Sequence, residues 1–151
     1  MASDTNKAAG TPRRLFVYNG GFLTQSRVRR ILELSGYAIK LGAPSDGDMV
    51  GVWGQSPTSG RGEKIAARKD APILRVEDAF LRSVLPGRAG SDPIGLHLDQ
   101  NGVHFDPSTP CDLEQMLATH PLDDTALLNR ARDAAARLKA LHLSKYNNFE
   151  P

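Results

Sequence analysis

The residues best suited to chemistry lie in Val76–Ser83, where two adjacent carboxylates, Glu77 and Asp78, close an apolar strand. An arginine and a hydroxyl, Arg82 and Ser83, follow within the next turn. Successive side chains of a strand point to opposite faces, so we expect one carboxylate to face a cleft and the other to hold the turn. A cleft carboxylate stays ionised beside a guanidinium, and Arg82 could instead bind a substrate carboxylate through two parallel hydrogen bonds. A structural ion pair that braces the loop is the alternative.

Two glycine turns, Asn19-Gly20-Gly21 and Ser59-Gly60-Arg61-Gly62, each lie between a predicted strand and a predicted helix. Neither is a dinucleotide fingerprint or a P-loop, because the full glycine spacing and the Gly-Lys-Ser/Thr ending are missing. Backbone N–H groups at such turns can still hold a phosphate or a carboxylate. Ordinary turn geometry is the alternative for both. Trp53, before the second turn, either fills the core or walls a ligand cleft.

The histidines and the cysteine give no sign of a metal or redox site. His97, His104, His120 and His142 lack metal-ligand spacing on a helix, and we interpret them as structural or surface residues. Cys111 is the only cysteine, which excludes an internal disulfide and a Cys-based zinc cluster. We therefore expect no metal and no resident cofactor.

Length and composition indicate a single globular domain. The chain has 151 residues, of which 40% are hydrophobic and 24% charged, both ordinary values. No apolar run approaches the roughly 18 residues that span a bilayer. The net charge of +2 conceals a basic start, because residues 1–30 hold six basic residues and one acidic residue. A solvated tail and helix face explain this charge more simply than nucleic-acid binding, since stacking aromatics are sparse there.

The hydrophobic pattern predicts an α/β fold. Strands are expected at 15–18, 37–41, 49–53 and 73–76, with helices at 26–35 and 62–69. This alternation with short connections predicts a Rossmann-like parallel sheet with flanking helices. The residues Asp99-Gln100-Asn101-Gly102 separate two short apolar runs, 94–98 and 103–105, and predict a β-hairpin.

The second half of the chain is predicted to be helical. Helices are expected at 111–119 and from Asp123 or Asp124 to about Leu143. Leucines near the end of the last helix, Leu138 and Leu141 among them, indicate an apolar face that needs a partner, or one that docks on its own domain. We expect a disordered leader at 1–12, the α/β lobe at 13–143 and a short linker at 144–151.

Four segments, in this order, carry a resemblance to a known family. They are Trp53-Gly54-Gln55-Ser56 with Ser59-Gly60-Arg61, the stretch Leu74–Val84, the stretch Gly95–Asp106, and Ser144-Lys145-Tyr146-Asn147. Through them, Val50 to Asn147 resembles the N-terminal half of a module in the bacterial capsular polysaccharide β-Kdo glycosyltransferases of the KpsC/LipA type.

The resemblance implies one lobe of a two-lobed, GT-B-like enzyme. Such an enzyme transfers Kdo (3-deoxy-D-manno-oct-2-ulosonic acid) from the sugar nucleotide CMP-Kdo with retention. Its acceptor is a Kdo linker on a phospholipid at the cytoplasmic face of the inner membrane, which implies a cytoplasmic protein with peripheral membrane contact and no nucleic-acid partner. The candidate catalytic residues are Glu77 and Asp78. The candidate substrate-binding residues are Arg82, Ser83, Gly54, Gln55, Ser59 and Gly20.

The sequence departs from the family at three points. A family module continues into a second lobe with most of the CMP contacts, whereas this chain ends at Pro151. The family often has glycine at the place of Ala79, and arginine or lysine at the place of Gln55. We therefore expect a fragment that is inactive alone. The alternative is a free-standing α/β binding module for an anionic sugar or nucleotide.

Overall fold

The structure, a computed structural model, describes residues 10–148, except for the side chain of Arg88. The predicted leader and linker therefore lie partly outside the described residues. The chain divides into two compact units, residues 1–75 and 76–151. The division falls within strand β4 (Ile73–Asp78), and each unit is described by itself below.

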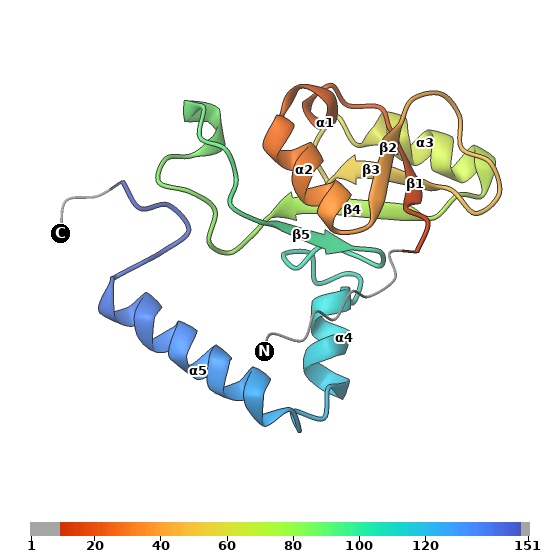
Figure 1. The fold of residues 1–151 in the computed structure, drawn as a ribbon. Coiled ribbons are helices and arrows are strands. Elements are labelled where there is room, and N and C mark those ends of the chain that lie inside the picture. The colour runs from red at the N-terminus through yellow and green to blue at the C-terminus, as the bar shows by residue number, and fades with distance from the viewer. Residues whose placement is uncertain (1–9, 149–151) are drawn as a thin grey trace. The chain divides into compact units, whose positions relative to one another are not determined.

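Unit 1 is built on parallel strands (Figure 1). β1 (Arg13–Val17) pairs in parallel with β2 (Tyr37–Lys40) and with β3 (Met49–Trp53). The strand order of the sheet is β2-β1-β3-β4-β5, with β5 at Leu96–Asp99. The helices of this unit are α1 (Gly21–Thr24), α2 (Ser26–Leu34) and α3 (Gly60–Lys69). The predicted α/β class with a Rossmann-like sheet is confirmed, and the short α1 is an addition to the prediction.

Local residue choice explains these elements. The interior strand β1 buries Leu15, Phe16 and Val17, as expected of a strand covered on both faces. The helix α2 buries Val28 and Leu32, four residues apart on one helical face. At Gly62 an added Cβ would lie 2.7 Å from Val52 Cγ1, so the missing side chain lets α3 pack directly on β3.

The predicted β-hairpin in unit 2 is wrong. Residues 103–105 form no strand, and β5 begins at Leu96 rather than at Ile94. Neither Asn101 nor Gly102 has the positive φ that a two-residue hairpin turn of type I′ requires. Gly102 serves a close approach instead, because a Cβ there would lie 3.1 Å from the carbonyl oxygen of Thr109.

The turn after β5 is organised by the buried carboxylate of Asp99. Its Oδ1 accepts hydrogen bonds from the backbone N–H groups of Asn101 and Gly102, at 2.8 and 2.7 Å. Its Oδ2 accepts from the N–H of Asp112 at 2.7 Å. Burial works to raise the pKa of Asp99, but these three bonds and the charge of His97 outweigh it and hold the pKa below its usual value.

Two helices complete unit 2, α4 (Asp112–Thr119) and α5 (Thr125–Ala140). Asp124, and not Asp123, caps α5 by accepting the N–H of Leu127 at 2.9 Å. The helix ends earlier than predicted and buries none of its residues, and Leu127 and Leu141 stay 47% and 62% exposed. The predicted apolar face is thus only partly covered within residues 10–148, where Leu128 and Leu138 are half-buried. None of the described helices is long and apolar enough to cross a membrane.

We predict that Asp99→Ala lowers the free energy of unfolding by about 2–4 kcal/mol at pH 7, because three backbone N–H groups lose their acceptor. Since the pKa of Asp99 is lowered in the folded state, its contribution is present at neutral pH and is lost as the pH falls through that pKa. The difference from the wild type should therefore shrink below about pH 4. Urea unfolding between pH 3 and 7 measures it, with the exposed Asp92→Ala as control. A pH-independent difference would contradict this account.

Candidate functional site

In unit 2 the loop after β4 is held by chain segments on both sides. The N–H of Ile94 donates to the carbonyl oxygen of Arg82 at 2.9 Å. From the C-terminal segment, the carbonyl oxygen of Lys145 accepts from the N–H groups of Arg82 and Ser83, at 3.1 and 3.4 Å. The N–H of Asn147 donates to the carbonyl oxygen of Val84 at 2.9 Å. The segment Ser144–Asn147 thus fixes the backbone of the predicted site residues Arg82 and Ser83.

The side chain of Arg82 is buried inside unit 2, where it forms hydrogen bonds and an ion pair. Its Nη1 donates to Ser83 Oγ and to the carbonyl oxygen of Ser91, both at 2.8 Å. Its Nε lies 2.8 Å from Asp78 Oδ2, an ion pair whose angle is not that of a hydrogen bond. A Cβ at Gly87 would collide with the guanidinium, so the bare backbone of Gly87 makes room for it. Arg82 and Asp78 therefore brace the turn, and a contact of Arg82 or Ser83 with substrate stays a prediction.

Glu77, the other carboxylate of the pair, lies half-buried near the end of β4. Burial raises its pKa above the ordinary value, and the neighbouring charge of Asp78 acts in the same direction. A hydrogen bond from the N–H of Asp78 and the positive charges of Lys145 and His97 oppose that rise without cancelling it. The carboxyl of Glu77 is therefore a stronger base than an ordinary glutamate. Its role in catalysis stays a prediction.

Sequence reasoning missed a pair of histidines, of which His97 acts electrostatically on Glu77. The rings of His97 and His104 lie 5.2 Å apart, and the ring of Phe80 lies 5.0 Å from that of His104. His97 Nε2 and His104 Nδ1 are buried and make no hydrogen bond within the described chain. Burial, with the charges of His97 and Lys145, lowers the pKa of His104, so its imidazole is neutral at pH 7. The sequence offered one signal for this pair, because His97 and His104 lie on either side of the turn at 99–102.

In unit 1 the loop after β3 holds three predicted substrate-binding residues. Gly54 is buried with φ +43°, and its carbonyl oxygen accepts from Arg75 Nη1 at 2.8 Å. The same nitrogen donates to Glu63 Oε1 at 2.8 Å, and Ser59 Oγ lies 3.4 Å from that oxygen. Arg75 thus ties the beginning of the loop to the beginning of α3. Gln55 is exposed on this loop.

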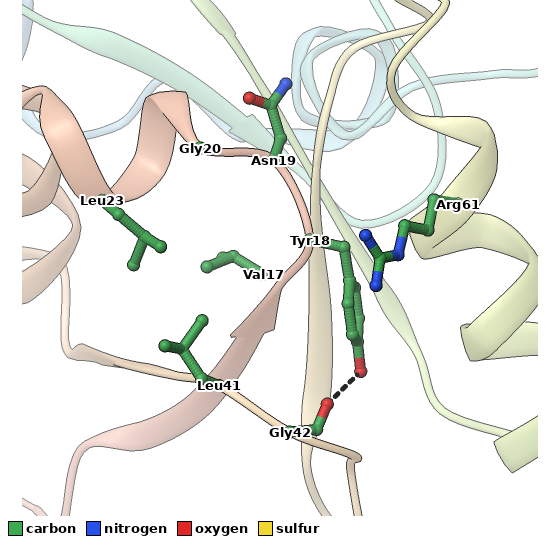
Figure 2. Close-up of a pocket in the computed structure, with 8 residues that line it drawn as sticks. All are labelled: Val17, Tyr18, Asn19, Gly20, Leu23, Leu41, Gly42 and Arg61. Carbon is green, nitrogen blue, oxygen red and sulfur yellow. Dashed lines mark hydrogen bonds between the residues drawn. The ribbon is translucent and has the colours of Figure 1, made fainter.

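Gly20 lies on the neighbouring loop, which Asn19 connects to the first. Asn19 Oδ1 accepts the N–H of Gly21 at 2.9 Å, and its Nδ2 donates to Thr58 Oγ1 at 2.7 Å. Beside this bridge is a cavity of about 310 Å³ lined in part by Tyr18, Gly20 and Arg61 (Figure 2). Unit 1 therefore brings Gly20, Gly54 and Ser59 to the loops at the carboxyl ends of β1 and β3, the edge where open α/β sheets bind ligands.

The candidate residues of unit 2 suit acid–base chemistry on a polar ligand. Unit 2 supplies a basic carboxyl, a neutral imidazole and the exposed ring of Phe80, which could stack against the apolar face of a sugar. Within residues 10–148, no group of three or more His, Cys, Asp and Glu side chains is placed to hold a metal ion.

The chain matches a known protein family over most of its length. The profile of the family described as "Capsule polysaccharide biosynthesis protein" matches residues 48–151. The chain is 30% identical over 139 residues to the "Capsule polysaccharide modification protein LipA" of Neisseria meningitidis serogroup B, which covers 90% of this chain and 20% of LipA. It is 41% identical over 83 residues to the "Lipopolysaccharide-processing protein LpsZ" of Rhizobium meliloti, which covers 54% of this chain and 19% of LpsZ.

A solved structure shows the same fold. KpsC of Thermosulfurimonas dismutans, a "beta Kdo 2,4 transferase", superposes with a TM-score of 0.80 at 24% sequence identity. The match covers 94% of this chain and 44% of that chain. The predicted Rossmann-like α/β lobe is thus confirmed as a fold that this chain shares with part of that protein. This chain spans about a fifth of the length of the LipA relative and less than half of the KpsC chain.

We predict that Arg82 and Asp78 are energetically coupled. Arg82→Met should cost about 3–5 kcal/mol of unfolding free energy, because it leaves the carboxylate of Asp78 without its countercharge. In a double-mutant cycle with Asp78→Asn, the coupling should be about 1–3 kcal/mol. The exposed pair Arg30 and Glu33, 3.9 Å apart on α2, is the control and should couple by no more than about 0.5 kcal/mol. Equal coupling in both pairs would show that Arg82 does not brace the turn.

Proposed function

Because the chain belongs to the capsule polysaccharide biosynthesis family, we propose that it is one lobe of a retaining β-Kdo transferase that uses CMP-Kdo. The acceptor is a Kdo linker on a phospholipid at the cytoplasmic face of the inner membrane. The similarity to LipA over 90% of the chain and the shared fold with a Kdo transferase support this proposal. No metal takes part in it.

The observation that carries the proposal is the different surroundings of two adjacent carboxyls. Asp78 is paired with the buried guanidinium of Arg82, whereas Glu77 has no ion pair within the described residues and has a raised pKa. In the proposed reaction the bond between the anomeric carbon of Kdo and the phosphate oxygen breaks and CMP leaves. The acceptor oxygen bonds to that carbon on the face that CMP left, while the carboxylate of Glu77 accepts the proton of the acceptor hydroxyl. A higher pKa makes it more effective as a base near neutral pH. Asp78 acts by holding the turn that positions Glu77.

The alternative, a free-standing binding module for an anionic sugar or nucleotide, has one observation in its favour. The cavity beside Tyr18 and Arg61 lies wholly in unit 1 and needs no second lobe. Binding there is compatible with either function, so it does not decide between them. The exposed Leu127 in α5 and Leu141 just after it favour the lobe, because isolated domains seldom expose a large apolar surface.

We predict that the 151-residue chain alone does not transfer Kdo. Transfer requires donor and acceptor in near-attack geometry, which contributes on the order of 7–11 kcal/mol. The chain matches less than half of the KpsC chain, and we expect the remaining part to hold the donor. Incubation with CMP-Kdo and a lipid-linked Kdo acceptor, followed by chromatography of the products, measures transfer. A complete relative is the positive control, and turnover by the chain alone would refute the prediction.

We predict that replacing the glutamate that matches Glu77 with glutamine in a complete relative lowers kcat by about 10²–10⁴-fold, because the amide cannot accept the proton. In the present chain, Glu77→Gln should raise the free energy of unfolding at pH 7. The raised pKa of Glu77 means that its protonated form favours the folded state, and this stability is lost as the pH rises through that pKa.

The kcat of the complete relative and the free energy of unfolding of this chain together separate a catalytic role of Glu77 from a structural one. A catalytic carboxyl gives lower activity together with higher stability at neutral pH, and the stability difference should vanish at acid pH. The exposed Glu33→Gln on α2 serves as the matched control and should change neither. Unchanged kcat for the glutamine variant would remove Glu77 from catalysis.

A further inference from the structure

The cavity in unit 1 has rigid walls. The hydroxyl of Tyr18 donates to the carbonyl oxygen of Gly42 at 2.7 Å, which ties the end of β1 to the chain after β2. Asn19 is fixed on both sides, by Gly21 and by Thr58. Figure 2 shows the tyrosine ring between this hydrogen bond and the guanidinium of Arg61. Burial raises the pKa of Tyr18, so its phenol remains a hydrogen-bond donor at neutral pH. A preformed site of this kind binds ligand without first having to order its walls.

Arg61 is the single charged side chain among the lining residues of this cavity. Its guanidinium carbon lies 5.9 Å from the centroid of the Tyr18 ring, and it forms no ion pair within residues 10–148. The nearest acidic residue of the same helical turn, Glu63, is engaged by Arg75 at 2.8 Å. The charge of Arg61 is therefore available to a ligand.

The position of Arg61 in the helix works against folding. It occupies the first turn of α3, where the helix dipole is positive and a cation is unfavourable. Arg68 and Lys69 lie in the last turn, where cations are favourable. The charge of Arg61 therefore does not stabilise α3 through the helix dipole, and its side chain lines the cavity instead.

Size and lining restrict the ligand. A volume of about 310 Å³ is at the lower end of the roughly 300–1,000 Å³ of small-molecule sites. It suits one sugar residue and is too small for a whole sugar nucleotide. Val17, Leu23 and Leu41 form an apolar wall, whereas Arg61 provides the charged contact.

We propose that this cavity is a subsite for a single sugar residue with one oxyanion, which Arg61 binds through its guanidinium while the sugar ring packs against Tyr18 and the apolar wall. The proposal deepens the transferase function and rests on it for the identity of the sugar acid. The oxyanion is either the carboxylate of a Kdo unit or a sugar phosphate, and both make the same two-pronged contact with arginine.

The test is a binding titration of the ¹⁵N-labelled 151-residue chain, monitored at the side-chain Nε–H of Arg61 and the backbone N–H of Tyr18. The ligands are methyl-Kdo glycoside for the carboxylate, mannose 1-phosphate for the phosphate and methyl mannoside as the neutral sugar. Arg61→Gln should weaken binding of the charged sugar by at least about tenfold, and Arg61→Lys should weaken it less. Arg68→Gln, on the same helix and outside the cavity, should bind like the wild type.

Each outcome bears on the proposal. Saturable shifts with either charged sugar, lost in Arg61→Gln, support it and identify the oxyanion. Equal binding of the neutral sugar, unchanged binding by Arg61→Gln, or no binding up to about 20 mM overturns it. The assay measures binding without transfer, so its failure leaves the role of Glu77 in a complete enzyme intact. Conversely, if the transferase proposal fails, this titration still tests the subsite.

Discussion

A buried positive charge determines how unit 2 is arranged. The guanidinium of Arg82 is taken out of water, which is tolerable only because Asp78 supplies a countercharge and Ser83 and Ser91 accept its hydrogen bonds. Because Asp78 supplies this countercharge, its role is structural. Glu77, the adjacent carboxyl, is left in a half-buried position with no such partner, and its pKa rises. The two neighbouring acids thus differ in their surroundings, because Asp78 is paired with Arg82 and Glu77 is not.

Much of unit 1 could be predicted from the sequence because its signals are local. Apolar runs at Leu15–Val17 and Met49–Trp53 and the stripe of Val28 and Leu32 depend on spacing within a single element. The glycine at 36, with φ +85°, ends α2 as its type predicts. The regular elements were therefore placed to within a few residues at their ends.

The failures share one cause, which is that they depend on contacts between distant positions. An Asn-Gly pair favours a hairpin only if both residues adopt positive φ, and here the carboxylate of Asp99 holds a different turn. His97 and His104 come together through that turn, so their contact could not be predicted from the spacing of residues in a helix or a strand. Ser91, nine residues from Arg82, accepts a hydrogen bond that no local pattern encodes. The adjacent carboxylates were recognised as candidates, but which of them braces the loop required the structure.

The absence of a side chain at Gly87 has a consequence for how this protein can evolve. Any larger residue there would place its Cβ on the guanidinium of Arg82. A substitution at position 87 would therefore have to displace the guanidinium from its place beside Asp78, or be accompanied by a shorter residue at position 82, which leaves the acid at position 78 without a counterion. Changes at these three positions are therefore expected to be tolerated together more readily than one at a time.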